Sequence, residues 1–289
     1  MLQHLRSIIY LLEHKLYSTR RNFYYTDTEL FNNKQVCSDQ ALEAVALLLL
    51  CHRDSLPVYN AMSRGSVVGH LTFNNKVLQT AGDRVFDDGE PRGFSYQIRE
   101  KVLNIDARDS DIFGRDIPIL VDKITCLNSK VALFILVVES KAILVRLYSA
   151  GFQQRFRCII ITGSGVPDVA SRNFLRKTSL GLKLPVLALV DGDASGFKIL
   201  TIYNKGSKEM ACCNEGLTTP NIYWLGVRPS DIYHYTIPAS CRKSLDENEL
   251  KEVQLLIKKP FMDKHPRWKE ELEEMVKRKE KLTSKVQIK

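Results

Sequence analysis

Residues 186–200 read VLALVDGDASGFKIL, and this stretch decides the predicted fold. An apolar run ends abruptly at Asp191 and Asp193, and the apolar residues after Gly196 have the spacing of a helix. The pattern is typical of a buried parallel strand that ends in two carboxylates, followed by a tight turn and a helix. Open α/β sheets bind ligands beyond the carboxyl ends of their strands. Two carboxylates spaced i, i+2 can converge there on a hard cation such as Mg²⁺.

Three further apolar runs in the second half of the chain have the length of buried strands. They cover residues 131–138, 158–161 and 222–225. Helix-length spacers between them predict a parallel α/β domain. Glu139 ends the first run, and parallel strands place their carboxyl ends at one edge of the sheet. We therefore expect Glu139, Asp191 and Asp193 to share a Mg²⁺ site, because three clustered carboxylates repel unless a cation neutralises them.

The simpler alternative for the acids is structural. In this alternative, Asp191 serves only as the cap of the following helix, and Glu139 is an ordinary surface acid. The strand context of all three acids and the glycine at 196 favour the metal site. A nearby turn, Gly163-Ser-Gly165, matches neither a P-loop nor a dinucleotide-binding motif, so we expect a plain turn there.

The N-terminal part of the chain has a helical pattern. Apolar residues at helical spacing predict helices over residues 2–16 and 41–50. Residues 56–59 and 63–69 have the pattern of two short strands and a glycine-bounded turn, and we expect them to form a small hairpin. Helices followed by a hairpin, with basic residues around them, predict a winged-helix DNA-binding domain over residues 1–75.

Two more segments complete the predicted organisation. Residues 76–126 have mixed composition and are expected to form an extended connection with short strands. Residues 127–289 form the parallel α/β domain, with a charged helical tail that is broken at Pro260 and Pro266. The predicted fold class is therefore α/β, or α+β overall.

Composition narrows the class of protein. Lys and Arg number 42 against 33 Asp and Glu, so the formal charge is +9. This excess suggests nucleic acid as a partner, although a merely basic protein is the alternative. The 7 cysteines show no metal-ligand spacing, which argues against a zinc site or a disulfide framework and fits a reducing compartment. We see no secretion signal, and no apolar run reaches the roughly 18 residues that a membrane span needs.

Residues 20–27 read RRNFYYTD and contain a candidate nucleophile. A tyrosine hydroxyl can attack a phosphodiester to give a phosphotyrosyl link that conserves the bond energy. The developing charge must be stabilised, and a neighbouring arginine and a metal suit that task. The alternative is that Tyr24 and Tyr25 only pack inside a helical domain.

Taken together, these motifs resemble the family of topoisomerase VI A subunits (type IIB topoisomerases), which includes eukaryotic relatives that make programmed meiotic double-strand breaks. Residues 21–27 resemble the catalytic tyrosine motif of the family, and the three acids resemble its Toprim metal site. Further landmarks occur in the family's order at residues 63–69, 137–139, 161–168, 189–193 and 224–231. The tail over residues 259–272 resembles the meiotic branch. The resemblance covers nearly the whole chain, and it rests on the joint order of the motifs.

The resemblance implies a mechanism and partners. Tyr25 would become linked to the 5′ phosphate of double-stranded DNA, Arg21 would bind or polarise the scissile phosphate, and the three acids would hold Mg²⁺. Arg20 and Arg64 are expected to contact DNA. A homodimer would share its active sites between protomers, with a topoisomerase VI B-like subunit, related to GHKL-type ATPases, as partner. The expected location is the nucleus.

Several positions depart from the family pattern. Asn22 stands where an aspartate is usual, Ser164 replaces a lysine, and Ala194 replaces a proline. None of these removes a metal ligand or the nucleophile. The chain is also short at both ends, as we expect of an isoform, a divergent paralogue or a partial gene.

Four functions stay open from the sequence. The first is a transesterase that makes meiotic breaks, and the second is a topoisomerase VI A-type protein that reseals them. The third is a catalytically weak DNA-binding or scaffolding paralogue, which Asn22 and the short ends keep under consideration. The fourth is a Toprim primase or nuclease, for which Tyr25 would be dispensable.

Overall fold

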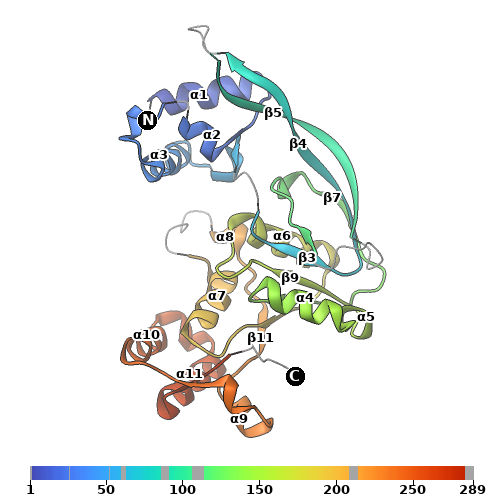
Figure 1. The fold of residues 1–289 in the computed structure, drawn as a ribbon, viewed down its shortest axis with the longest axis vertical. Helices are drawn as coiled ribbons and strands as arrows, with labels where there is room; N and C mark the ends of the chain where they lie inside the picture. The colour runs from blue at the N-terminus through green and yellow to red at the C-terminus, as the bar shows by residue number, and fades with distance from the viewer. Residues whose placement is uncertain are drawn as a thin grey trace.

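The computed structural model shows two lobes joined by a long β-hairpin (Figure 1). The structure describes residues 2–25, 27–51, 53–59, 63–85, 91–105, 114–207 and 214–283. The N-terminal helices form one lobe. A six-stranded sheet with helices on both faces forms the other lobe.

The N-terminal lobe packs three helices around a small core of its own. They are α1 (Leu2–Glu13), α2 (Arg20–Tyr25) and α3 (Gln35–Leu48), with the short turns η1 (Glu29–Phe31) and η2 (Arg53–Ser55). The core consists of Ile8, Leu11, Phe23, Leu42, Val45, Ala46, Leu56 and Val58. The helices predicted over residues 2–16 and 41–50 are confirmed, although α3 begins earlier than expected.

The hairpin expected over residues 56–69 was wrong. Strand β2 (Val58–Tyr59) pairs in parallel with β1 (Ser18–Thr19). Strand β3 (Ser66–Val68) pairs antiparallel with β9 and β6 in the large sheet. Both segments are short and apolar, so their pattern could predict strands but could not identify their partners. The winged-helix assignment and the domain boundaries at 75 and 126 stay predictions.

The large sheet has the strand order β11-β10-β8-β9-β3-β6. Its parallel part consists of β8 (Phe134–Val138), β9 (Cys158–Thr162), β10 (Val186–Leu189) and β11 (Ile222–Gly226); β6 (Arg115–Asp116) lies at the other edge. The predicted parallel α/β domain is therefore confirmed.

Helices bury both faces of the parallel strands. The helices α4 (Lys141–Ser149) and α5 (Phe152–Arg155) cover one face, and α6 (Val169–Leu182) and α7 (Ala194–Lys205) cover the other. Alternate residues of β8 accordingly belong to two different apolar clusters. Burial on both faces explains why these strands are continuous apolar runs in the sequence.

The connection between the lobes contains longer strands than expected. Strands β4 (Leu71–Val85) and β5 (Pro91–Ile105) are 15 residues each and pair antiparallel. Strand β7 (Thr125–Asn128) pairs with β4, just after the turn η3 (Val121–Lys123). The hairpin runs from the large sheet to the N-terminal lobe, where β5 contacts α2 (Figure 1). The expectation of short strands holds for β6 and β7 but was wrong for β4 and β5, because their mixed composition lacks the strict alternation that reveals a strand.

The tail is helical and broken at both prolines, as predicted. From residue 247 on, the tail consists of α10 (Glu247–Ile257), η6 (Pro260–Lys264), α11 (Pro266–Arg278) and β13 (Glu280–Leu282). The shorter elements α8 (Asn214–Leu217), α9 (Asp231–His234), η5 (Ala239–Cys241) and β12 (Arg242–Ser244) precede it. The helices α10 and α11 bury apolar side chains in the core of the large sheet. The small β12–β13 sheet was not expected. Within the described ranges, no helix is long and apolar enough to cross a membrane.

A candidate active site in two parts

The turn between β10 and α7 holds two of the predicted acids in a tight backbone arrangement. Asp191 follows the buried strand and is 5% exposed. Asp193 is the N-cap of α7, and its Oδ1 accepts a hydrogen bond from the Gly196 backbone N–H at 2.8 Å. A Cβ at position 196 would lie 2.2 Å from the carbonyl oxygen of Asp191, so only glycine fits. The residue that caps α7 is thus Asp193, not Asp191.

Glu139 lies at the same edge of the sheet. It follows β8, and its Oε2 accepts a hydrogen bond from the Asp191 backbone N–H at 2.8 Å. Its carbonyl oxygen accepts from the Gly165 N–H at 2.8 Å and from the Thr162 Oγ1 at 3.2 Å. The neighbouring parallel strands β8 and β10 therefore bring Glu139 against Asp191. This agrees with the prediction that both residues lie at the carboxyl edge of one sheet.

The C-terminal strand β13 closes one side of the turn. Gly192 and Leu282 exchange two backbone hydrogen bonds of 2.8 and 3.0 Å. Thr283 donates its hydroxyl to Asp191 Oδ2 at 3.2 Å. Sequence reasoning missed this contact, because the only local signal is a short segment after a charged helix, 92 residues from Asp191.

The electrostatic setting of the turn favours a bound cation. Burial raises the pKa of Asp193 above its ordinary value, and the charge of Asp191 raises it further. The Gly196 N–H and the positive charge of Lys281 oppose this effect. A cation would relieve both the burial cost and the repulsion, and carboxylate oxygens are ligands that Mg²⁺ prefers. The donor chemistry of the turn fits Mg²⁺.

The side chains are not arranged as a closed metal cage. Among the residues that the structure describes, no three His, Cys, Asp or Glu side chains are grouped closely enough to hold a metal ion. Glu139 and Asp193 each direct one carboxylate oxygen to a backbone N–H. Convergence of the three acids on one ion stays a prediction.

The second part of the site is on α2. Arg21 and Tyr25 are four residues apart and therefore share one face of the helix. The Nε and Nη2 atoms of Arg21 each lie 3.3 Å from the Tyr25 hydroxyl, and its guanidinium carbon lies 5.7 Å from the ring centroid. Tyr25 is 54% exposed. A solvent-facing hydroxyl beside a fixed positive charge can serve as a nucleophile, because the guanidinium stabilises the phenolate that forms.

The neighbours of Tyr25 have structural roles. Phe23 is buried in the lobe core, and the Tyr24 ring packs against Phe31 with centroids 6.5 Å apart. Arg20 forms a two-point ion pair with Asp39, with contacts of 2.6 and 2.9 Å. Tyr24 thus packs within the lobe, whereas Tyr25 contacts the Tyr24 ring, with centroids 5.2 Å apart, and stays 54% exposed. The nucleophilic role of Tyr25 stays a prediction. The structure gives Arg20 a carboxylate partner inside its own lobe, so its expected contact with DNA stays a prediction.

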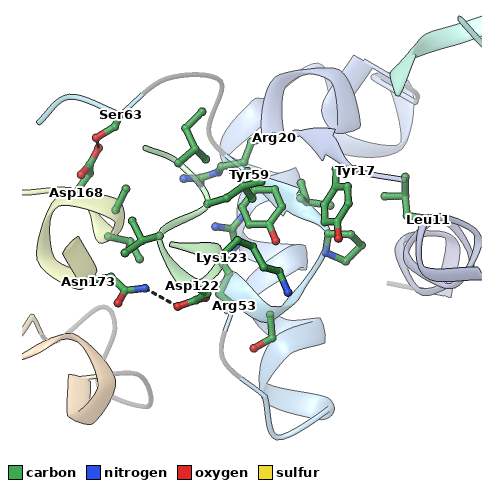
Figure 2. Close-up of a pocket in the computed structure, with 18 of the residues that line it drawn as sticks. Leu11, Tyr17, Arg20, Arg53, Tyr59, Ser63, Asp122, Lys123, Asp168 and Asn173 are labelled. Carbon is green, nitrogen blue, oxygen red and sulfur yellow. Dashed lines mark hydrogen bonds between the residues drawn. The ribbon is translucent and has the colours of Figure 1, made fainter. Parts of the chain in front are cut away.

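A cavity of about 460 Å³ lies between the two lobes (Figure 2). Tyr17, Arg53 and Tyr59 line it from the N-terminal lobe, and Asp122 and Lys123 line it from the other. Its lining includes neither Tyr25 nor any of the three acids. The cavity is therefore separate from both parts of the candidate site.

The two parts of the site lie far apart within one chain. Figure 1 places α2 in the N-terminal lobe and the start of α7 in the other lobe. The helix α2 packs against α3, β1, β2 and β5, which are elements of its own lobe and of the connecting hairpin. One chain alone does not bring Tyr25 to the acids in this arrangement.

A parallel sheet with acids at its carboxyl edge, joined to a helical lobe that exposes an Arg–Tyr pair, defines a Toprim-type protein with a candidate tyrosine nucleophile. The family profile for the Toprim domain of the topoisomerase 6 A subunit and Spo11 matches residues 134–286, and the profile "Type IIB DNA topoisomerase" matches residues 1–58. The chain belongs to this family, which unites the topoisomerase 6 A subunits with the Spo11 proteins.

Relatives from both branches of the family match most of the chain. It is 42% identical to the DNA topoisomerase 6 A subunit of Arabidopsis thaliana over 266 residues. These residues make up 92% of this chain and 56% of that protein. It is 40% identical to the A3 form of the DNA topoisomerase 6 A subunit of Oryza sativa subsp. indica, over 94% of this chain and 55% of that protein. It is 33% identical to the meiotic recombination protein SPO11 of Mus musculus, over 93% of this chain and 61% of that protein. The chain thus spans little more than half the length of these relatives.

Proposed function

We propose that this chain is an A-type topoisomerase VI protein that cleaves double-stranded DNA through a phosphotyrosyl intermediate. The observation that carries the proposal is the exposed Tyr25 hydroxyl beside the Arg21 guanidinium. This pair lies in the segment matched by the type IIB topoisomerase profile. The net charge of +9 suits a DNA partner.

The chemical step is a transesterification. The Tyr25 hydroxyl oxygen attacks the phosphorus of a phosphodiester, and the bond from phosphorus to the 3′ oxygen breaks. The proton of the tyrosine leaves to water, and the departing 3′ oxygen takes up a proton to become a hydroxyl. One phosphodiester replaces another, so the step is reversible. Arg21 stabilises the phenolate before attack and the phosphate oxygens during attack.

Glu139, Asp191 and Asp193 would hold Mg²⁺ at the carboxyl edge of the sheet. A bound Mg²⁺ supplies Lewis-acid stabilisation to phosphate oxygens. The chain's own contribution is to place the acids: the strand ends fix their backbones, and burial makes the Asp193 carboxylate favour a cation. We place Arg64, an exposed residue just before β3, among the DNA contacts of this proposal.

The separation of the two parts favours an active site shared between protomers. In a homodimer, Tyr25 of one protomer would act with the acids of the other. A topoisomerase VI B-like subunit is the proposed partner. The nucleus is the proposed location, since the relatives are named for DNA topoisomerase and for meiotic recombination.

Two outcomes of cleavage are possible within this chemistry. The identities to the two topoisomerase 6 relatives, 42% and 40%, exceed the 33% to the mouse SPO11 protein. This difference favours an enzyme that reseals its breaks, whereas the tail over residues 259–272 suggested the meiotic branch. A meiotic role in which the breaks persist stays a prediction beside the resealing function.

A covalent adduct tests the proposal. The chain is incubated with duplex DNA, Mg²⁺ and a B-like subunit, and denaturing gels are used to detect DNA-linked protein. We expect an adduct that disappears in Tyr25→Phe and persists in Tyr24→Phe, the matched control. An adduct that persists in Tyr25→Phe and disappears in Tyr24→Phe would move the nucleophile. DNA cleavage without any adduct would favour the Toprim nuclease, and DNA binding without cleavage would favour the scaffolding paralogue.

A further inference from the structure

Asp168, the first residue before α6, uses its two carboxylate oxygens for different purposes. Its Oδ1 accepts the Ser171 backbone N–H at 2.8 Å, which is an ordinary N-cap. Its Oδ2 accepts the Arg64 backbone N–H at 2.9 Å and lies 3.4 Å from the Ser63 hydroxyl. Figure 2 shows Ser63 and Asp168 facing each other at the edge of the cavity. The cap needs one oxygen only, so the second oxygen serves a link across 104 residues of sequence.

The backbone of Arg64 is held from its other side as well. Its carbonyl oxygen accepts the Ser164 hydroxyl at 2.8 Å. Gly65 allows the close approach, because a Cβ there would lie 2.2 Å from the Ser171 hydroxyl oxygen and 2.9 Å from the Thr162 carbonyl oxygen. Both backbone polar groups of Arg64 are therefore fixed to the loop after β9 and to the start of α6.

The same loop also holds Glu139. Thr162 donates its hydroxyl to the Glu139 carbonyl oxygen at 3.2 Å and accepts the Ser164 N–H at 3.1 Å. A continuous chain of hydrogen bonds thus joins the backbone of Glu139 to that of Arg64. The Arg64 side chain itself is exposed. The positively charged Arg64 side chain is therefore exposed on a backbone segment that is hydrogen-bonded to the loop after β9. The same loop holds the backbone of Glu139, one of the candidate metal ligands.

We infer that Asp168 is a positioning residue for Arg64. It fixes the Arg64 backbone, so the guanidinium is held ready for a DNA phosphate and loses little conformational freedom on binding. The inference rests on the proposed function, since it assumes that DNA is the ligand. It assigns Asp168 a role that a helix cap alone does not require.

The variant Asp168→Asn distinguishes the proposed positioning of Arg64 from the capping of α6. Asparagine caps a helix about as well as aspartate, so the Ser171 bond is retained. The amide NH₂ that replaces Oδ2 is a donor and cannot accept the Arg64 N–H. The matched control is Asp246→Asn. Asp246 caps α10 through the Glu249 N–H at 2.8 Å, in the C-terminal tail.

The test measures binding of a short duplex DNA by the Tyr25→Phe chain without Mg²⁺, over a series of salt concentrations. Arg64→Ala should lower the affinity about tenfold, as expected for the loss of one charged contact. It should also reduce the slope of log affinity against log salt by about 0.9. Asp168→Asn should cause a loss of similar size, the double variant should lose no more than Arg64→Ala, and Asp246→Asn should bind like the parent.

Each other result has one meaning. If Arg64→Ala weakens binding and Asp168→Asn does not, the positioning role is wrong. If the two losses multiply in the double variant, Asp168 acts independently of Arg64 and the inference is also wrong. If the parent chain binds no DNA at all, the proposed function fails first. Melting curves check that Asp168→Asn and Asp246→Asn are both fully folded at the temperature of the binding assay, so that a folding defect is recognised.

Discussion

The two parts of the candidate site differ in how firmly the fold holds them. The acids follow buried parallel strands, and backbone hydrogen bonds fix Glu139 and Asp193 in place. Tyr25 ends a helix of six residues and is 54% exposed. The acid part is therefore positioned by the core of its lobe, whereas the tyrosine part lies on an exposed surface. This contrast is what we expect if the nucleophile acts on a site that its own chain does not complete.

The largest effect is expected from removing one acid. Asp191→Asn should lower adduct formation by about 10³-fold, because the loss of a metal ligand removes charge stabilisation in the transition state. DNA binding without Mg²⁺ should persist, since it depends on the basic surface. Asp263→Asn is the control, because this acid is exposed and its ion pair with Lys269 is long, at 3.9 Å. Normal adduct formation by Asp191→Asn would remove the metal site from the mechanism.

Stability measurements should separate the rigid part from the exposed part. Gly196→Ala should reduce the free energy of unfolding by about 3 kcal/mol or more, because its Cβ would meet the Asp191 backbone at 2.2 Å. Tyr25→Phe should change it by less than about 0.5 kcal/mol, as is usual for exposed positions.

A second glycine provides the control for this comparison. Gly181 is an exposed residue in α6, where a Cβ would make only ordinary contacts, at 3.5 Å from Leu127. Gly181→Ala should therefore be stabilising by up to about 1 kcal/mol. Urea unfolding curves provide all three values. A mild effect of Gly196→Ala would show that the turn is less rigid than its hydrogen bonds imply.

Added Mg²⁺ should stabilise the acid part without any DNA. At about 100 times its dissociation constant, a ligand that binds only the folded state adds about 2.7 kcal/mol. The thermal midpoint of the wild-type chain should therefore rise with MgCl₂ but not with NaCl of equal ionic strength. Asp193→Asn keeps the cap but should lose the Mg²⁺ effect. No shift in the wild-type midpoint would contradict a Mg²⁺ site in the free chain.

Because the pKa of Asp193 is raised, the effect of Asp193→Asn on the free energy of unfolding should depend on pH. An acid whose pKa is higher in the folded state costs stability once it ionises. The protonated Asp193 carboxyl contributes its full share to stability below the pKa of the unfolded state, near 3.8. This contribution is lost as the pH rises through the pKa of the folded state. Without metal at neutral pH, Asp193→Asn should therefore be more stable than wild type. The difference should disappear in acid, and a constant difference across pH would mean that ionisation of Asp193 is not the cause.

The smallest effect is expected at the start of α2. The Asn22 N–H bonds the Thr19 hydroxyl at 3.1 Å in the first turn of the helix. Asn22→Asp would place a negative charge there, which stabilises a helix by about 0.3–1 kcal/mol. If the acid that is usual in the family also orients Arg21, the adduct rate should rise severalfold. Asn22→Ala is the control, and a slower Asn22→Asp would show that the asparagine is the better residue here.

The sequence predicted where the acids lie in the sheet, although their metal-binding role stays a prediction. Long apolar runs ending in acids have one simple explanation, a buried parallel sheet, and this explanation places Glu139 and Asp191 at one edge. The contact of Thr283 with Asp191 could not be predicted, because it depends on how the tail folds back. The wrong hairpin over residues 56–69 has a similar cause, since strand partners are set by tertiary packing.

Mixed dimers test most directly whether the exposed tyrosine acts on the acids of another protomer. Tyr25→Phe and Asp191→Asn chains, with tags of different size, are co-expressed and incubated with the B-like subunit, DNA and Mg²⁺. Each variant alone should give no adduct. The mixture should restore one composite site, with adduct only on the Asp191→Asn chain and a nick in one strand. Absence of any adduct from the mixture, while wild type forms one, would contradict the shared site.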